Sequence, residues 1–367
     1  MKAALPGATE RGGEGRGLRV AVLSYPMLTQ VQGGLEVQIV ETIAALRALG
    51  CDIRLIDPLR EKLAAFDLVH VFALNGGNHQ MVAFARLAER PVVVSPLVRP
   101  YWTAALGRRA RLVDRLMGRL TGWQVATEYR DCEVALERAD HVVALGAAEK
   151  QSIVAAFRTP ADRISVVPNG IPPRFFGARP EPFAERFGLA PGFVLCVASI
   201  DEHKNQLGLA RALAASRQQL VLIGECNGPN RAYLDQVLAL PHVSHLGSLR
   251  YDDPLLASAY AAAGVFALAS ASEVMPLVVL EALAAGTPVV MTRHHGMDTA
   301  PLREVLIEVE PRDESAIAAA VERQFARGPR REACAAAVEH LTWRAAGQSL
   351  LSVYDRVLRA RSAAAAA

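Results

Sequence analysis

Long apolar runs and paired cysteines are both missing from this chain of 367 residues. No stretch of eighteen apolar residues occurs, so we expect no membrane-spanning helix. Residues 1–17 are rich in glycine and lack the apolar core of a secretory signal, and we expect them and residues 363–367 to be flexible tails. The cysteines are scattered without a CxxC pair, which excludes a disulfide framework and a thiolate metal site and is typical of a reducing cytosol. They are Cys51, Cys132, Cys196, Cys226 and Cys334.

A strong charge of either sign is missing as well. The chain has 40 lysines and arginines against 37 aspartates and glutamates, and a net charge of +3 is too small to indicate a nucleic-acid partner. A hydrophobic content of 51% with 21% charged residues excludes a disordered chain. The length is sufficient for two domains with separate cores.

What the sequence does contain is a regular alternation of β-branched apolar runs with stretches rich in alanine, leucine and arginine. This alternation predicts parallel sheets that are covered by helices on both faces. The expected strands in the first half are residues 19–24, 52–56, 68–72, 91–95, 141–145 and 164–167. Those in the second half are residues 193–198, 220–223, 243–246, 265–269 and 288–291, and the expected helices include residues 35–49 and 132–139.

The two halves are separated by a proline-rich break that begins at Pro168-Asn169-Gly170 and extends to Pro182. We expect Asn169 and Gly170, which tolerate unusual backbone angles, to act as a hinge and as the floor of a cleft. The predicted fold is therefore α/β, with Rossmann-like domains at residues 18–172 and 183–342 and a last helix at 343–367 that packs back on the first domain. Two such domains facing each other enclose a deep interdomain cleft, where we expect the chemistry.

The most informative segment is residues 272–288, where Glu273 and Glu281 stand eight residues apart. Strand-like runs on either side predict a strand–loop–helix–turn–strand unit, with the helix beginning near Leu277. The free amides of Leu277 and Val278 would then form an anion site able to hold a diphosphate. We expect Glu273 to accept hydrogen bonds from sugar hydroxyls and Glu281 from a ribose. Without its flanking strands, such a glutamate pair would more often be a surface feature.

Several further elements occur in a fixed order along the chain. A glycine pair, Gly33-Gly34, follows the first strand, and Val167-Pro168-Asn169-Gly170-Ile171 precedes the break. Lys204 follows the first strand of the second half, and the glutamate pair runs on into a glycine–threonine–proline turn at Gly286. With Thr342-Trp343 near the end, these elements over nearly the whole chain resemble the GT-B glycosyltransferases, specifically the large retaining family 4.

The resemblance implies a role for each of these elements. Lys204 would neutralise the leaving diphosphate, and Glu273 would act with it as the second catalytic group. The glycine pair would let the backbone approach the donor phosphates, although an ordinary strand–helix turn explains it equally. The base would be read by the backbone around Gly247. The implied donor-binding residues are Gly33, Gly34, Ser199, Lys204, Gly247, Glu273, Met275, Pro276, Leu277, Val278 and Glu281.

The chain departs from the family pattern at two positions. Family members carry an arginine that pairs with the lysine, whereas here Ser199 lies in that neighbourhood and no arginine occurs between Gly192 and Ala210. Many members also carry a histidine after the strand equivalent to residues 91–95, where this chain has Ser95. His70 lies nearby in sequence, and we expect it to be a satisfied core residue rather than a ligand.

The segment 103–124, from Thr103 to Gln124, is basic and amphipathic. It holds five arginines against the single acid Asp114. At helical spacing, Arg108, Arg111, Arg115 and Arg119 form one stripe, and Leu112, Leu116, Leu120 and Trp123 form the adjacent one. Two interpretations are open: a helix that packs its leucines on the core and solvates its arginines, or a helix that lies on anionic lipid.

The function predicted from these features is a retaining, metal-independent transfer of a sugar from a nucleoside-diphosphate sugar to an acceptor hydroxyl in polysaccharide, lipopolysaccharide or glycolipid biosynthesis. We expect no cofactor, a glycan or lipid-linked acceptor, and a cytoplasmic protein that contacts the inner face of the membrane. No metal cluster is predicted, because Asp252-Asp253 and His294-His295 lack suitable spacing. A non-catalytic sugar-nucleotide-binding homologue and a sugar-nucleotide epimerase are the alternatives.

Overall fold

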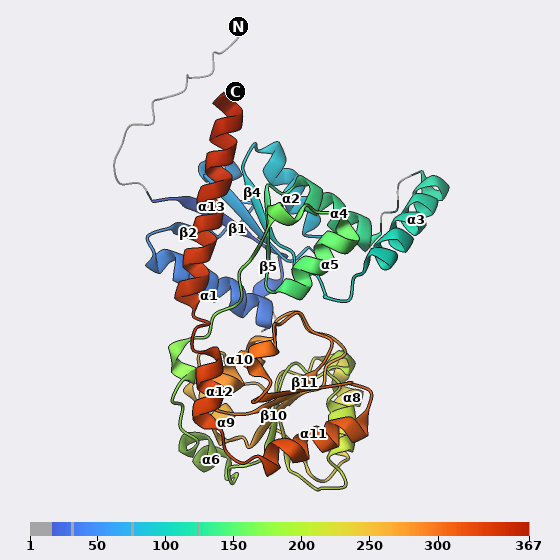
Figure 1. Ribbon diagram of the computed structural model, residues 1–367, viewed down its shortest axis with the longest axis vertical. Helices are drawn as coiled ribbons and strands as arrows, with labels where there is room; N and C mark the ends of the chain where they lie inside the picture. The colour runs from blue at the N-terminus through green and yellow to red at the C-terminus, as the bar shows by residue number, and fades with distance from the viewer. Residues whose placement is uncertain (1–16, 31–32, 75–76, 123–124, 126, 367) are drawn as a thin grey trace.

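The computed structural model describes residues 17–30, 33–74, 77–122, 125 and 127–366. It consists of two α/β domains stacked along the long axis of the molecule (Figure 1). Each domain has one six-stranded parallel sheet, with strand order β2-β1-β3-β4-β5-β6 in the first and β12-β11-β10-β7-β8-β9 in the second. These two sheets, with helices on both faces, confirm the predicted α/β fold of two Rossmann-like domains.

The N-terminal domain alternates strands and helices from its first residues. Its strands are β1 (Arg19–Leu23), β2 (Asp52–Leu55), β3 (Leu68–Phe72), β4 (Val92–Ser95), β5 (His141–Ala144) and β6 (Ile164–Val166). Its helices are α1 (Gly34–Ala48), α2 (His79–Leu87), α3 (Ala104–Thr121), α4 (Glu128–Arg138) and α5 (Ala147–Phe157). Alternate residues of β1 are buried in two separate apolar clusters, one on each face of the sheet.

The C-terminal domain repeats the pattern after two short elements. Its strands are β7 (Val194–Val197), β8 (Leu220–Ile223), β9 (Val243–His245), β10 (Val265–Leu268), β11 (Val289–Thr292) and β12 (Leu306–Val309). Its helices are α6 (Glu181–Phe187), α7 (Gln206–Ala212), α8 (Arg231–Leu238), α9 (Pro254–Ala262), α10 (Leu277–Ala284), α11 (Glu314–Ala326) and α12 (Arg331–Val338). One continuous apolar cluster forms its core.

The structure differs from the sequence prediction at two places near the end of the chain. The edge strand β12 was not predicted, because Glu308 interrupts its short apolar run and half of its residues are exposed or partly exposed. The last helix, α13 (Trp343–Ala366), continues through the alanines that we expected to form a flexible tail. Alanine has the highest helix propensity, so this end of the chain extends the helix. The predicted tail at residues 1–17 lies outside the described residues except for Gly17.

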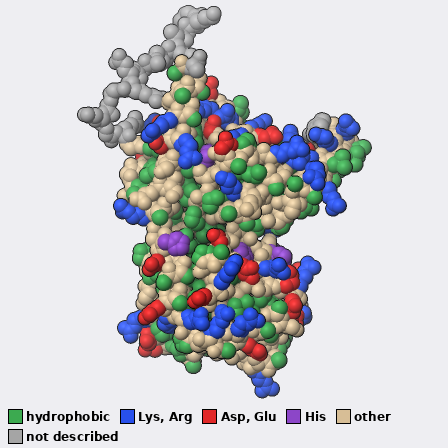
Figure 2. All heavy atoms as spheres, in the orientation of Figure 1, with side chains coloured by type: hydrophobic (Ala, Val, Ile, Leu, Met, Phe, Trp, Pro, Cys, Tyr) green, Lys and Arg blue, Asp and Glu red, His purple; other side chains and the backbone are tan. Residues whose placement is uncertain are grey.

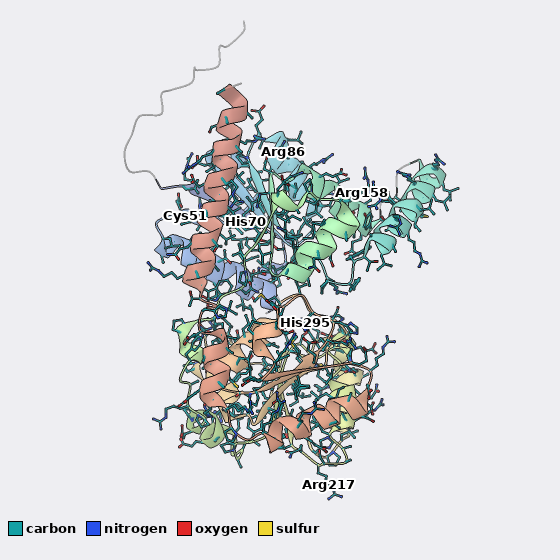
Figure 3. All side chains as sticks on the ribbon, viewed as in Figure 1. Cys51, His70, Arg86, Arg158, Arg217 and His295 are labelled. Carbon is teal, nitrogen blue, oxygen red and sulfur yellow. The ribbon has the colours of Figure 1, made fainter. Side chains whose placement is uncertain are left out.

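Helix α13 returns to the N-terminal domain and packs beside α1 (Figure 1). Trp343, Leu350 and Tyr354 of this helix belong to the same buried cluster as the strands of the first sheet. The Tyr354 hydroxyl lies 2.7 Å from Nδ1 of His70, while Nε2 of His70 lies 2.9 Å from the Ser95 hydroxyl. His70 is fully buried (Figure 3), and burial lowers the pKa of its imidazole to about 3. It is therefore the satisfied core residue that we predicted.

The chain crosses between the domains twice, and the two crossings lie against each other. Ile171 pairs with Thr342, and the Ile171 amide donates to the carbonyl of Leu341 over 2.9 Å. A Cβ atom on Gly170 would lie 2.1 Å from the backbone nitrogen of Trp343, so only glycine fits. The Asn169 side chain donates to the Met275 carbonyl across the cleft over 3.4 Å. These contacts fix the backbone at Asn169 and Gly170, where the sequence predicts a hinge.

None of the described helices is both long enough and apolar enough to cross a membrane. Helix α3 is nevertheless unusual, because it projects from the side of the N-terminal domain instead of lying flat on the sheet (Figure 1). Its Thr103 cap accepts a hydrogen bond from the Leu106 amide, and Gly122 ends it in the left-handed conformation.

Candidate active site

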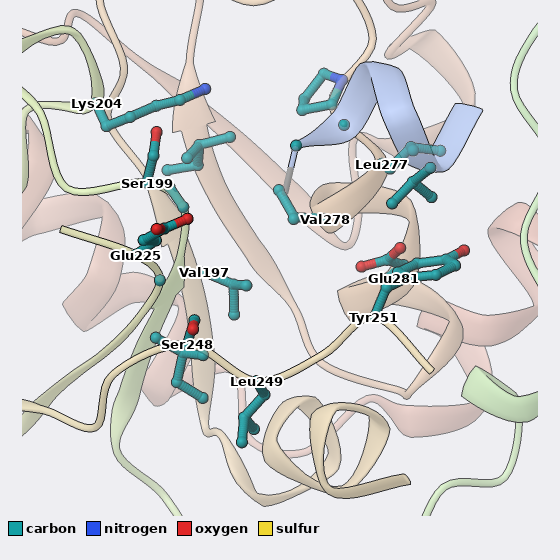
Figure 4. Close-up of a pocket in the computed structure, with 18 of the residues that line it drawn as sticks. Val197, Ser199, Lys204, Glu225, Ser248, Leu249, Tyr251, Leu277, Val278 and Glu281 are labelled. Carbon is teal, nitrogen blue, oxygen red and sulfur yellow. The ribbon is translucent and has the colours of Figure 1, made fainter. Parts of the chain in front are cut away.

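A cavity of about 330 Å³ opens between the two domains at the carboxyl ends of the C-terminal strands. Figure 4 shows that its walls come from the loops after β7, β8 and β9, from the start of α10 and from the start of α1. The residues that line it include Gly33, Gly34, Val37, Val197, Ser199, Lys204, Glu225, Asn227, Ser248, Leu249, Tyr251, Glu273, Pro276, Leu277, Val278 and Glu281. Both domains thus contribute to one site, as the predicted cleft requires.

Helix α10 begins at Leu277, as predicted, and points its first turn at the cavity. Pro276 at the N-cap has no amide proton, and its ring fixes a backbone angle that suits a helix start. The amides of Leu277 and Val278 make no hydrogen bond within the described residues. Their free donors and the helix dipole favour an anion at this place.

Lys204 and Glu273 meet at the mouth of this cavity. The ammonium nitrogen of Lys204 lies 2.7 Å from Oε1 of Glu273, and their side chains are 23% and 12% exposed. Lys204 ends a short 3-10 turn, Glu202–Lys204, which Asp201 caps by accepting from the Lys204 amide over 3.0 Å. This partly desolvated pair places one cation and one carboxylate in the cavity that the start of α10 also lines.

The loop that carries Glu273 is held on both sides by backbone hydrogen bonds. The Ala271 amide donates to the His203 carbonyl over 2.7 Å, and the Glu273 amide donates to the His294 carbonyl over 2.8 Å. Farther along, the Gly296 amide donates to the Val274 carbonyl over 2.7 Å. The Glu273 carboxylate is thus preorganised by two neighbouring loops rather than by side-chain contacts alone.

Glu281 lies deeper, on the opposite side of the α10 start. It is 3% exposed and accepts a hydrogen bond from the buried Tyr260 hydroxyl over 2.9 Å. Burial raises the pKa of its carboxyl to about 7, against the opposing effects of the Tyr260 hydroxyl and of Arg174. A carboxyl group held in this way has a free oxygen for a ligand hydroxyl at the inner end of the cavity.

Most of the predicted donor-binding residues come together in this cavity, and two of them do not line it. Gly247 adopts a φ of 76° and accepts the Gly224 amide, so its neighbours Ser248 and Leu249 form the wall instead. Met275 turns toward the hinge, where its sulfur accepts the Asn169 amide.

The structure also adds residues to the site that the sequence did not single out. Arg174 lies with its guanidinium 4.3 Å from the centre of the Tyr251 ring, and it pairs with Glu41 of α1 over 3.7 Å. Tyr260 orients the Glu281 carboxyl. Arg174 follows Asn169 and Gly170 closely in sequence, and only the fold brings it against Tyr251, which lines the cavity.

The two departures from the family pattern have structural counterparts. Ser199 donates to Asp201 over 2.7 Å, so the place of the expected arginine is taken by a short polar pair. Ser95 takes the place of the family histidine, and its hydroxyl lies 2.9 Å from Nε2 of His70. Among the described residues no group of three or more potential ligands could hold a metal ion. His294 and His295 pair instead with Glu310 and Glu308, Asp252 pairs with Arg250, and Asp253 caps α9.

Helix α3 shows that one of the two sequence interpretations is wrong. The face that packs against α4 and α5 is small or polar and consists of Gly107, Arg111, Asp114 and Gly118. Arg111 points inward, where it donates to the Tyr129 hydroxyl over 2.5 Å and to the Ala156 carbonyl over 2.7 Å. The leucine stripe therefore does not pack on the core. Leu112, Leu116 and Leu120 are 68%, 59% and 74% exposed, while Trp123 and Gln124 lie outside the described residues.

Two Rossmann-like domains that face each other across one cleft, with the free start of α10 and the buried Glu281 of the same helix in its wall, define a GT-B type protein. Residues 32–175 match the family model described as "Glycosyltransferase Family 4", and residues 191–326 match the one described as "Glycosyl transferases group 1". The chain belongs to this glycosyltransferase family.

Individual proteins extend the comparison. The chain is 30% identical to D-inositol 3-phosphate glycosyltransferase of Corynebacterium diphtheriae over 61% of its own length, and 26% identical to the uncharacterized glycosyltransferase MJ1607 of Methanocaldococcus jannaschii over 70%. These alignments span 58% and 66% of the two relatives.

Solved structures share the fold at low sequence identity. Sucrose-phosphate synthase from Thermosynechococcus elongatus superposes with a TM-score of 0.73 at 19% identity, covering 94% of this chain and all of that one. Anabaena HepE in complex with UDP-glucose superposes with a TM-score of 0.66 at 17% identity, covering 92% of this chain and all of that one.

Proposed function

We propose that this protein is a retaining, metal-independent glycosyltransferase that moves a sugar from a nucleoside-diphosphate sugar to an acceptor hydroxyl. The observation that carries the proposal is the Lys204–Glu273 pair, 2.7 Å apart, in the same cavity as the free amides that start α10. One structural neighbour, HepE, is a complex with UDP-glucose, which supports a donor of this class.

In the proposed mechanism each group acts on one part of the donor. The Leu277 and Val278 amides and Lys204 hold the diphosphate, and Glu281 accepts from the ribose at the inner end. Glu273 accepts from sugar hydroxyls and stabilises the positive charge that develops on the ring. The glycosidic bond to the diphosphate breaks, and its electron pair leaves with the phosphate oxygen. The acceptor oxygen bonds to the same face of the anomeric carbon, and its proton passes to the diphosphate.

Metal-independence in this proposal rests on the chemistry of the donor contacts. Lys204 supplies a full positive charge and α10 supplies backbone dipoles at the place where the diphosphate develops negative charge. Together these groups do the work that a divalent cation does in other phosphate sites. Adding a chelator should therefore leave turnover unchanged.

A non-catalytic sugar-nucleotide-binding homologue is the second candidate, because Ser95 and Ser199 replace two groups that the family uses. A thermal-shift screen of UDP-, GDP-, ADP- and dTDP-sugars, followed by a hydrolysis assay on each stabilising donor, separates the two. We expect one donor class to raise the melting temperature and to be slowly hydrolysed. Binding of a donor without turnover, with glycan and lipid acceptors alike, would establish the non-catalytic protein instead.

We further propose that the protein works at the cytoplasmic face of a membrane, with α3 as the contact. Its exposed face combines three leucines with Arg108, Arg115 and Arg119, which make no ion pair within the described chain. In Figure 2, apolar and basic side chains meet at the tip of the projecting helix. Asp114, the helix's one acid, is buried and accepts from the Thr127 hydroxyl over 3.0 Å. This combination favours an anionic lipid surface.

Replacing Leu112, Leu116 and Leu120 together with serine should weaken binding to phosphatidylglycerol vesicles by about 10- to 100-fold, because the apolar contact with the bilayer is lost. Co-sedimentation with vesicles measures the change, and added salt should weaken the wild-type binding through the arginines. Leu59 and Leu87 are 95% and 78% exposed elsewhere, so serine at both provides a matched control. If the α3 variant and this control sediment equally with the vesicles, α3 does not bind the membrane.

A further inference from the structure

A second cavity, of about 430 Å³, lies in the N-terminal domain between the β4–α3 loop and the start of α4. Its walls include Leu97, Arg99, Tyr101, Trp102, Glu128 and Tyr129. In Figure 1 the loop from β4 to α3 runs along the edge of this domain that faces the C-terminal domain. The donor site does not use any of these residues.

The back wall of the cavity is a rigid aromatic cluster. The Trp102 ring lies 5.3 Å from that of Tyr129 and 5.5 Å from that of Phe157, and Tyr129 stacks on Phe157 at 4.9 Å. The Tyr129 hydroxyl is fixed by the Ala156 carbonyl at 2.6 Å and by Arg111. The more exposed Tyr101 ring stacks on Trp102 at 6.1 Å. Such a preformed aromatic surface matches the apolar face of a sugar or cyclitol ring.

Two charged side chains at the cavity complete the arrangement. Arg99 and Glu128 are both exposed, and neither forms an ion pair or a side-chain hydrogen bond within the part of the chain that the structure describes. A free guanidinium matches a phosphate with two parallel hydrogen bonds, and a free carboxylate accepts from ring hydroxyls. The aromatic wall and the two charges together fit a polyhydroxylated ring that carries a phosphate.

Backbone contacts connect this cavity to the sugar side of the donor site. The buried Glu149 carboxylate accepts from the amides of Val98, over 2.8 Å, and Leu145, over 2.7 Å, and so ties the cavity wall to the loop after β5. The next residue, Gly146, abuts Gly296 so closely that a Cβ would lie 2.1 Å from its carbonyl oxygen. The Gly296 amide in turn donates to the carbonyl of Val274, beside Glu273. These contacts link a loop that lines the cavity to the loop that carries Glu273.

We propose that this cavity is the acceptor subsite, and that the acceptor is a phosphorylated sugar or cyclitol ring, with Tyr101 packing on the ring, Arg99 binding the phosphate and Glu128 accepting from ring hydroxyls. The proposal rests on the proposed glycosyltransferase function. Because α3 begins at the next residue but one after Trp102, a lipid that carries such a head group would enter from the membrane surface, whereas a free sugar phosphate would enter from solution.

Titration calorimetry on the full chain with glucose 6-phosphate, glucose and inorganic phosphate tests the subsite without requiring turnover. We expect glucose 6-phosphate to bind more tightly than either fragment. Arg99→Ala should weaken that binding by about 10-fold or more. Tyr101→Ala should weaken the binding of both glucose and glucose 6-phosphate. Both side chains are exposed, so the variants should fold, and Arg303→Ala removes an exposed arginine of the C-terminal domain as the control.

A second arm of the experiment distinguishes the two sources of the ring. Vesicles that contain phosphatidylinositol should retain wild-type protein more strongly than phosphatidylglycerol vesicles of equal charge if the acceptor is a lipid, and Arg99→Ala should abolish the difference. Equal retention, together with binding of glucose 6-phosphate, assigns the site to a soluble acceptor. The subsite proposal is wrong if glucose 6-phosphate binds no more tightly than glucose or inorganic phosphate, and if Arg99→Ala binds it as tightly as the wild type does. If the protein still hydrolyses the donor in that case, the proposed glycosyltransferase function is not contradicted.

Discussion

Replacing Lys204 with methionine should lower kcat by about 100- to 1,000-fold, the cost of removing one preorganised group that stabilises developing charge. Methionine keeps the apolar stem and removes only the ammonium, which lies 2.7 Å from Glu273 in the cavity that the start of α10 also lines. The diphosphate that leaves would then be stabilised by backbone dipoles alone. Initial rates of nucleoside-diphosphate release at saturating donor measure the effect.

The control for this experiment is Lys62→Met, which removes an exposed lysine of the N-terminal domain. Glu273→Gln should also lower turnover, while leaving nucleotide affinity close to that of the wild type. The double variant shows whether the two groups act together, because residues in contact give non-additive losses. Normal turnover in Lys204→Met, with a folded protein, would contradict the mechanism at its central contact.

The fold was predictable because its signals are local and repeated. Eleven strands were expected from apolar β-branched runs, and each lies within about two residues of its expected bounds, an ordinary uncertainty for element ends. The start of α10 was expected near Leu277 and lies there, and Pro276 before it suits a helix start. Among the strands of the described residues only β12 was missed, because an edge strand that is half exposed gives a weak signal.

The candidate site was less predictable wherever it depends on contacts between distant residues. The sequence indicated Lys204 and Glu273 separately, but not that they pair across 69 positions. It could not place Arg174 against Tyr251, nor show that the leucines of α3 face outward. In α3 the periodicity was correct, but the sequence left the direction of the leucine face open, and the close approach of Gly107 to Ala156 of α5 shows that the other face is covered. Pattern alone cannot decide which face of such a helix is covered.

The second large effect is expected at Glu281. Replacing it with alanine should weaken nucleotide binding by about 10- to 100-fold, because a buried carboxylate that accepts a ribose hydrogen bond is lost from the inner end of the cavity. Calorimetric titration with the nucleoside diphosphate of the donor measures the affinity. Tyr260→Phe is the matched control, since it removes the 2.9 Å hydrogen bond to Glu281 but leaves the carboxylate in place.

The Glu281 carboxyl should make both protein stability and nucleotide affinity depend on pH, each in a direction that its pKa determines. Burial raises the pKa of Glu281 to about 7, so ionisation of this group opposes folding. The stability of the unliganded protein should therefore fall as pH rises from about 4.5, the ordinary pKa of the carboxyl, to about 7. The ionised carboxylate, in contrast, accepts a hydrogen bond from the ligand more strongly than the neutral acid does. Nucleotide affinity should therefore increase as pH rises through about 7 in the wild type.

Glu281→Gln isolates this contribution, because the amide keeps the shape of the side chain and an oxygen for the Tyr260 hydroxyl but does not titrate. The nucleotide's own phosphate titrates equally with both proteins, so only the difference between their pH profiles reports Glu281. We expect that difference to widen from about pH 6 to about pH 8 as the wild-type carboxyl ionises. Parallel profiles would mean that the ribose does not reach this acid, and the donor would then lie elsewhere in the cleft.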